Sequence, residues 1–234
     1  MNIQKIKLYH YPLTRSSRVR WLLHEILDDD FELEIVNIYG GQLYDKKFIL
    51  INPFHSVPLL EIEEKNGELI HMIESGAIVT FLADIYSEKR LAPHPILEFK
   101  KRMDYLQMLH FCSTMMDMAL WQIRMNLHIL PKNERNETIV KRYENKFSTE
   151  IEPFISNRLE NYKYICGNEF CAVDCIFGHN VMWARSYGLF NSGVIKSYLS
   201  NISKRPSFVK AFSDFKDFNA YVPKESILAK NFTG

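Results

Sequence analysis

The stretch VPLLE, from Val57 to Glu61, and the stretch IESGAI, from Ile73 to Ile78, decide how this chain folds. The first begins a strand at a proline, and the second begins a helix at a Glu-Ser pair. A proline removes a backbone donor and, when its peptide bond is cis, turns the preceding carbonyl and amide outward. Ser75 and the first amides of its helix can hold a carboxylate, because helix N-termini bind anions. Together the two stretches predict a site for a small anionic peptide.

The hydrophobic pattern of the first 86 residues predicts a small α/β domain. Strands are expected at 6–10, 31–38, 59–62 and 69–72, and helices at about 17–28, 46–50 and 74–86. The last two strands flank Asn66-Gly67, a strong hairpin turn. A hairpin in a chain that also contains a βαβ unit requires a mixed sheet, here of four strands.

The pattern changes after this domain. Residues 88–95 are charged and proline-bearing, which is typical of a linker, and from Ile96 onward the periodicity is helical. Helices are expected at 96–125, 133–160, 172–187 and 192–199, with a last one after Arg205-Pro206. We therefore predict an α/β domain at 1–87, a linker at 88–95 and an all-helical domain at 96–234.

Composition narrows the classes of function. Lys and Arg total 29 against 28 Asp and Glu, so no excess of positive charge points to nucleic acid. Without a long apolar span or a signal peptide, no membrane association is expected and a cytoplasmic protein is predicted. The cysteines have neither zinc spacing nor a Cys-x-x-Cys pair, so no metal site is expected, and we interpret Cys171 and Cys175 as packing residues.

Several motifs in order resemble one family. Leu8-Tyr9 followed by Arg18-Val19-Arg20, then Asn52-Pro53 with Val57-Pro58, then the Glu74-Ser75 helix start resemble the thioredoxin-like domain of the cytosolic glutathione transferases. In the helical region the run 167–170 before Asp174 is similar to a buried capping motif of that family, and Arg205-Pro206 to its last conserved helix start. The N-terminal run looks most like the bacterial and theta-like, serine/threonine-type members.

The resemblance implies a thioredoxin-like domain that binds glutathione as co-substrate and an apolar second-substrate site shared with the helical domain. It implies a homodimer, and a detoxification reaction in which the glutathione thiolate attacks a small apolar electrophile. Two alternatives stay open. One is another glutathione-dependent reaction on the same fold, such as peroxide or disulfide reduction or isomerisation. The other is a non-enzymatic regulator that binds protein partners.

The implied reaction needs a hydroxyl that favours the thiolate, because the thiol of glutathione is mostly protonated at neutral pH. A hydroxyl at the start of the first helix supplies a hydrogen bond beside a positive helix end. Thr14 and Ser16 are the preferred candidates, and Tyr9, near the end of the first strand, is the alternative. The loop between these residues contains no cysteine, which argues against the members that form a mixed disulfide with glutathione.

The glutathione contacts follow from the same resemblance. The backbone of Val57 would pair with the cysteinyl residue as an added strand, with Pro58 in the cis form. Ser75 and its helix amides would take the γ-glutamyl α-carboxylate, and Glu74 would face the ammonium. Asp104 would reach that ammonium across a dimer.

The sequence departs from the family at two places. Ser56 stands where members often carry a lysine that holds the glycyl carboxylate, so either Gln42 or Lys46 takes this role or glutathione binds weakly. Cys171 stands where the helical capping motif usually has Ser or Thr, and we expect Asp174 to cap the helix by bonding back to the backbone near Cys171.

The second-substrate site is expected to use apolar side chains of the first long helix together with a tyrosine beside the candidate hydroxyls. Met and aromatic side chains form adaptable apolar sites, although packing in the core or at a dimer interface is the preferred explanation for any single one of them. The candidates are Tyr11, Met108, Phe111 and Met115.

Overall fold

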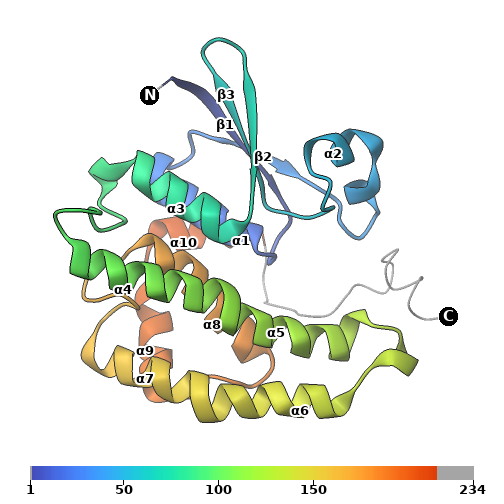
Figure 1. The fold of residues 1–234 in the computed structure, drawn as a ribbon, viewed down its shortest axis with the longest axis vertical. Helices are drawn as coiled ribbons and strands as arrows, with labels where there is room; N and C mark the ends of the chain where they lie inside the picture. The colour runs from blue at the N-terminus through green and yellow to red at the C-terminus, as the bar shows by residue number, and fades with distance from the viewer. Residues whose placement is uncertain (1, 215–234) are drawn as a thin grey trace.

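The computed structural model describes residues 2–214 and contains one mixed sheet, shown at the top of Figure 1. Its strands lie in the order β2-β1-β3-β4. Strand β1 pairs parallel to β2 and antiparallel to β3, and β3 and β4 form the predicted hairpin. The strands are β1 (Ile3–His10), β2 (Glu32–Ile35), β3 (Leu59–Glu64) and β4 (Leu69–Ile73). The predicted four-stranded mixed sheet is confirmed.

Helices cover both faces of this sheet, and alternation along the strands decides which side chains each helix meets. Ile6 and Leu8 of β1 point into the main core with α1 (Ser16–Leu27) and α3 (Ser75–Ile85). Tyr9 points to the opposite face, where it packs with Phe48 of α2 (Lys46–Ile51). Helices α1 and α3 consequently lie between the sheet and the helices below it (Figure 1).

The rest of the described chain is helical. Two of the expected long helices are interrupted or extended by π-helical segments, which widen the turn by one residue. Two long helical segments run one after the other. The first comprises α4 (Phe99–His110), η3 (Phe111–Met116), α5 (Asp117–Arg124) and η4 (Met125–Ile129). The second comprises α6 (Glu137–Lys146), η6 (Phe147–Ile151) and α7 (Glu152–Asn161). They are followed by α8 (Ala172–Ser186), α9 (Gly193–Ile202) and α10 (Pro206–Ala211), and the short 3-10 turns are η1 (Gln42–Tyr44), η2 (Ser87–Lys89) and η5 (Lys132–Glu134).

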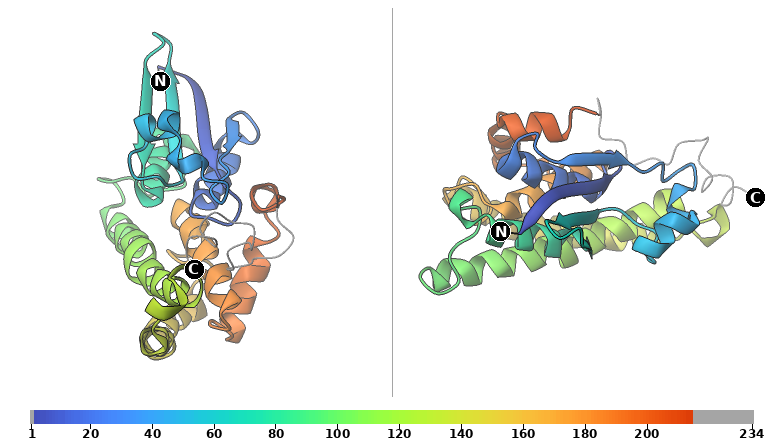
Figure 2. Two further views of the ribbon diagram at one scale, coloured as in Figure 1. Left: turned by 90° about the vertical axis from the view of Figure 1, so that its right-hand side faces the viewer. Right: turned by 90° about the horizontal axis from the view of Figure 1, so that it is seen from above.

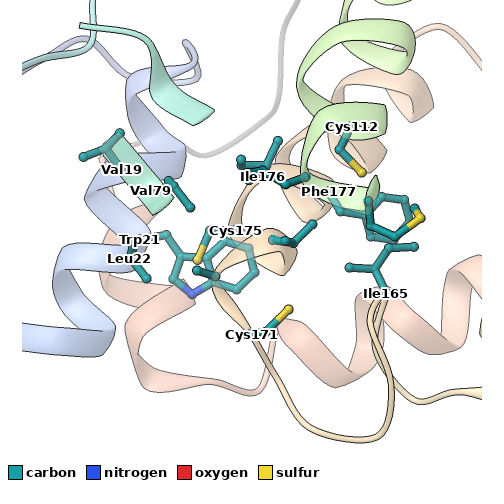
Figure 3. Close-up of a cluster of buried hydrophobic side chains, with 14 of the residues drawn as sticks. Val19, Trp21, Leu22, Val79, Cys112, Ile165, Cys171, Cys175, Ile176 and Phe177 are labelled. Carbon is teal, nitrogen blue, oxygen red and sulfur yellow. The ribbon is translucent and has the colours of Figure 1, made fainter. Parts of the chain in front are cut away.

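Helix α8 connects the α/β part of the chain to the helical part, because it is buried on nearly every side. Trp21 of α1 and Val79 of α3 face Cys175 and Ile176 of α8 across the core shown in Figure 3. A Cβ on Gly178 would lie 2.9 Å from the Trp21 ring. Because only glycine lets the indole ring approach the helix backbone this closely, α1 and α8 share one continuous core.

The start of α8 has the cap that the sequence predicted. The Asp174 carboxylate accepts from the backbone N–H of Cys171 at 3.0 Å and of Ile165 at 3.1 Å, and from the Tyr198 hydroxyl at 3.0 Å. The Cys171 side chain completes the reciprocal capping box. Burial still raises the pKa of Asp174 to about 6, although these donors oppose it.

Some boundaries differ from the sequence prediction. Strand β2 is half as long as the predicted run 31–38. The Val36 amide still donates to the His10 carbonyl of β1 at 2.8 Å, and the chain then turns from residue 38 onward. The last predicted helix is the short α10, and the remainder of the predicted helical domain, 215–234, lies outside the described residues. Within the described part, no helix is both long and apolar enough to cross a membrane.

Candidate active site

Three chain segments meet at one end of the sheet because of the strand register. Tyr9 of β1 pairs with Leu59 of β3, and Leu59 pairs with Ile73 of β4. The loop after β1, the Val57-Pro58 segment before β3 and the start of α3 after β4 therefore lie side by side. The stretch from Val57 to Glu61 and the stretch from Ile73 to Ile78 are therefore neighbours in space.

The first segment, at the start of α1, presents two hydroxyl groups. Thr14 is partly exposed, and its hydroxyl donates to the Tyr11 carbonyl at 2.8 Å. Ser16 is fully buried, and its Oγ lies 2.7 Å from Thr14 Oγ1 and accepts from the Tyr11 amide at 3.1 Å. Helix α1 begins without a side-chain cap, so these hydroxyls organise the preceding loop instead. Of the two, only Thr14 is placed to meet a ligand.

The second segment carries the cis bond that the sequence predicted between Val57 and Pro58. Among the described residues, no hydrogen bond involves the amide or the carbonyl of Val57. The loop before it is held by Asn52, whose amide donates to the Ser56 carbonyl at 2.7 Å. An extended peptide can thus pair with Val57 without displacing a bond of the protein.

The third segment is the start of α3. Glu74 is exposed and adopts a φ of 71°, which is strained for a residue with a side chain. Ser75 is buried, and its hydroxyl accepts from Arg18 Nη1 at 3.2 Å. Arg18 therefore fixes the Ser75 side chain, while the first amides of α3 face the same end of the sheet.

Arg18 is the centre of a buried polar network that connects the domains. It donates to Asp117 Oδ2 of α5 and to Asn180 Oδ1 of α8, both at 2.5 Å, and to His179 Nδ1 at 3.2 Å. Asp117 Oδ1 also accepts a hydrogen bond from Arg15 Nη2, at 2.6 Å. Burial opposes the charge of Asp117, but Arg18 and Arg15 outweigh it and lower the pKa of Asp117 to about 2. Burial and Arg18 lower the pKa of His179 to about 3, so this histidine is neutral and accepts from Arg18.

Aromatic side chains surround the outer part of the site. The Tyr11 ring meets the Tyr39 ring edge to face at a centroid distance of 5.3 Å. The Arg15 guanidinium lies 4.9 Å from the Trp121 ring and 5.5 Å from the Trp183 ring. Of the four candidates for the second-substrate site, Tyr11 is therefore the one that the structure brings beside Thr14.

The other second-substrate candidates lie elsewhere. Met108 is fully buried in the main core, so it lines no open site and this expectation is corrected. Phe111 packs on Phe154 of α7 at a centroid distance of 5.0 Å, and Met115 is 44% exposed. Ser113, by contrast, faces Gly76 at the start of α3. Phe111 and Met115 are two positions away from Ser113 and so point to the other side of the helix.

Three further predicted contacts are occupied by bonds within the chain. The Tyr9 hydroxyl donates to Glu61 Oε2 at 3.1 Å on the α2 face of the sheet, and so points away from the start of α1. Gln42 Oε1 accepts from the Asn37 amide at 2.7 Å. Asp104 forms an ion pair with Arg158 of α7 at 2.5 Å. Lys46 is exposed at the start of α2.

Sequence reasoning missed His10, Arg15, Asp117 and the pair His179-Asn180. Of these, Asp117 is the residue that the sequence pattern could have identified, since an acidic residue in an otherwise apolar helix is buried only when it is paired. In the described residues, no group of three or more His, Cys, Asp or Glu is arranged to hold a metal ion.

Comparisons with known proteins show which proteins the chain resembles. Residues 4–84 match the family model "Glutathione S-transferase, N-terminal domain". A glutathione S-transferase of Hyoscyamus muticus is 28% identical over 194 residues, which cover 79% of this chain and 86% of that protein. The glutathione S-transferase GstB of Escherichia coli K12 is 27% identical and covers 78% of this chain and 87% of its own length.

A solved structure shows the same fold. The glutathione transferase homologue from Lodderomyces elongisporus, crystallised with two glutathione molecules per subunit, has a TM-score of 0.79 and covers 92% of this chain and 100% of its own. Its sequence identity is 18%. Together with the match over residues 4–84, these findings show that the chain is similar to glutathione S-transferases over most of its length.

Proposed function

We propose that this protein conjugates the glutathione thiolate to small apolar electrophiles, with Thr14 as the hydroxyl that donates to the sulfur. The observation that carries the proposal is the meeting of three features at one end of the sheet. They are the partly exposed Thr14 hydroxyl, the Val57 amide and carbonyl, which have no hydrogen-bond partner within residues 2–214, and the N-terminus of α3.

The binding of glutathione follows from these features. Val57 offers an amide and a carbonyl to the cysteinyl backbone, and Ser75 with the first amides of α3 takes the γ-glutamyl carboxylate. The exposed Glu74 carboxylate faces the ammonium. We assign the glycyl carboxylate to Lys46, because the Gln42 side chain is already bonded within its own loop.

The energetics of thiol ionisation fit a threonine at a helix start. Lowering the thiol pKa by about two units requires about 3 kcal/mol. A charge-assisted hydrogen bond contributes about 1.5–3 kcal/mol and a helix N-terminus about 0.3–1 kcal/mol. Thr14 can release its bond to the Tyr11 carbonyl at little cost, since the Thr14 amide still donates to that carbonyl at 3.3 Å.

The electrophile would lie against Tyr11 and its neighbours. Tyr39 and Trp121 extend this aromatic surface toward α5. We also propose a serine/threonine-type enzyme that forms a homodimer in the cytoplasm, as the resemblance implies. Because residues 11–17 contain no cysteine, a mixed disulfide with glutathione is not part of the mechanism.

The test compares Thr14→Ala with Thr14→Ser, using a chlorinated dinitrobenzene as electrophile. We expect Thr14→Ala to lower kcat/KM about 100-fold, the cost of one donor to a developing anion, and Thr14→Ser to stay close to the wild type. Tyr9→Phe is the control, because the Tyr9 hydroxyl is bonded to Glu61. Equal rates for Thr14→Ala and the wild type, or turnover only with a hydroperoxide or a mixed disulfide, would contradict the proposal.

A further inference from the structure

A chain of short hydrogen bonds leads inward from Thr14. Thr14 Oγ1 lies 2.7 Å from Ser16 Oγ, and Ser16 Oγ lies 2.7 Å from His10 Nδ1. The other ring nitrogen of His10, Nε2, lies 3.2 Å from Asp214 Oδ2. Ser16 and His10 are both fully buried, so the chain connects a partly exposed hydroxyl to a histidine that water does not reach.

The proton positions in this chain follow from its geometry. Asp214 requires a proton on His10 Nε2, which leaves Nδ1 of the neutral ring as an acceptor. Ser16 therefore donates to His10, and the Ser16 oxygen accepts from Thr14 when the Thr14 hydroxyl turns to it from the Tyr11 carbonyl, which lies 2.8 Å away. When Thr14 donates inward, its oxygen presents a lone pair to an incoming thiol.

We propose that His10 accepts the proton of the glutathione thiol through Ser16 and Thr14, and that it thereby positions the Thr14 hydroxyl to donate to the thiolate. The inference rests on the proposed function. The S–H bond breaks as its proton bonds to Thr14 Oγ1, the Thr14 proton moves to Ser16 Oγ, and the Ser16 proton bonds to His10 Nδ1. Each hydroxyl gives one proton and gains one, so a thiolate and an imidazolium replace a neutral pair.

Afterwards, every contact in the chain persists with its direction reversed. His10 Nδ1–H donates to Ser16, Ser16 donates to Thr14, and Thr14 donates to the sulfur. This reversal explains why Thr14 can turn its proton to the ligand while its oxygen stays 2.7 Å from Ser16: a proton must lie between two oxygens at that distance.

The charges around His10 allow both states. Burial is the main effect that lowers the pKa of His10, and Arg20 and His24 add to it, so the ring is neutral before glutathione binds. Asp214 opposes them as a hydrogen-bond partner. Burial raises the pKa of Asp214, but its bond to His10 and the charge of Arg20 outweigh burial and lower this pKa, so Asp214 stays ionised. Once the sulfur is negative, the imidazolium lies between two anions, which favours the charged form.

The experiment counts protons. Calorimetry of glutathione binding in buffers of different ionisation enthalpy gives the number of protons released, and ultraviolet absorbance gives the fraction of thiolate. We expect the wild type, near neutral pH, to form the thiolate while releasing well under one proton per thiolate to the buffer. A wild type that releases one full proton per thiolate overturns the inference.

Two substitutions separate accepting the proton from positioning the hydroxyl. His10→Asn places an amide oxygen near the Nδ1 position, so Ser16 keeps an acceptor that cannot be protonated. His10→Gln reaches toward Asp214 and leaves Ser16 without its acceptor. Both variants should release one proton per thiolate, but they should differ in the thiol pKa. In His10→Asn the amide oxygen keeps Ser16 donating inward, so the Thr14 proton stays between the two hydroxyls and the apparent thiol pKa should rise by about one unit, which is about tenfold in kcat/KM at a pH below that pKa. In His10→Gln Ser16 is free to donate to Thr14, so the thiol pKa should stay close to that of the wild type. Equal pKa values in His10→Asn and the wild type would exclude the positioning role.

A surface variant covers the case in which substitutions of buried His10 do not fold. Asp214→Asn removes the carboxylate behind the imidazolium and should increase proton release. Asp84→Asn, which removes an exposed carboxylate paired with Arg102, is the matched control and should behave like the wild type. Identical proton release in Asp214→Asn and Asp84→Asn contradicts the inference. A wild type that conjugates nothing and leaves bound glutathione fully protonated overturns the proposed function itself.

Discussion

Replacing Asp117 by asparagine removes one buried charge and leaves the volume of the side chain almost unchanged. Asp117 bonds to both Arg15 and Arg18, and Arg18 is 1% exposed. Because these arginines outweigh burial and lower the pKa of Asp117 from 3.8 to about 2, the ionised carboxylate contributes about 2 kcal/mol to stability at neutral pH. Leaving the Arg18 charge without its counter-ion raises the expected loss to about 3 kcal/mol.

The pH dependence of this loss identifies its cause. The folded-state pKa of Asp117 lies below its unfolded value, so the contribution is fully present above about pH 4 and is lost as the pH falls toward 2. Urea denaturation of the wild type and Asp117→Asn at a series of pH values measures it. We expect the difference in unfolding free energy to be largest at pH 5–7 and to shrink below pH 4. A difference below about 1 kcal/mol at neutral pH, or one that does not change with pH, would refute the assignment of this ion-pair network.

Two other substitutions test separate parts of the structure. Ser75→Ala should weaken glutathione binding about tenfold in calorimetry, because one donor to the carboxylate is lost while the α3 amides remain, and an unchanged Kd would exclude this placement of the γ-glutamyl end. Asp174→Ala should destabilise the fold by about 2–4 kcal/mol in urea denaturation, since it leaves two buried amides and the Tyr198 hydroxyl without their acceptor. Loss of less than about 1 kcal/mol would show that the cap at α8 contributes little.

The fold was largely readable from the sequence because its signals are local. The proline before β3, the turn at Asn66-Gly67 and the Glu-Ser start of α3 each fix a backbone feature within a few residues. The cap at α8 was predicted even though Cys171 replaces the usual hydroxyl, because the bond from Asp174 to the backbone depends on spacing alone. The length of the edge strand β2 was overestimated, because the alternation of apolar and polar residues continues past the residues that pair with β1.

The site was less predictable because its parts come from distant segments. Thr14, Ser16 and Tyr9 are close in sequence, yet the pleat of β1 turns the Tyr9 side chain to the opposite face, and the packing of α1 buries Ser16. Met108 could not be distinguished from a pocket residue by helical spacing, since core and site residues share that period. The partners of Arg18 lie about 57 to 162 positions away, so only the folded structure brings them together.

The most direct test of the account follows the thiol of glutathione bound to the wild-type protein through an ultraviolet pH titration. If the start of α1 stabilises the thiolate, the midpoint should lie about two units below that of the free thiol, whose pKa is near 8.5 as in free cysteine. A midpoint equal to that of free glutathione, or no saturable binding at millimolar glutathione, would contradict it.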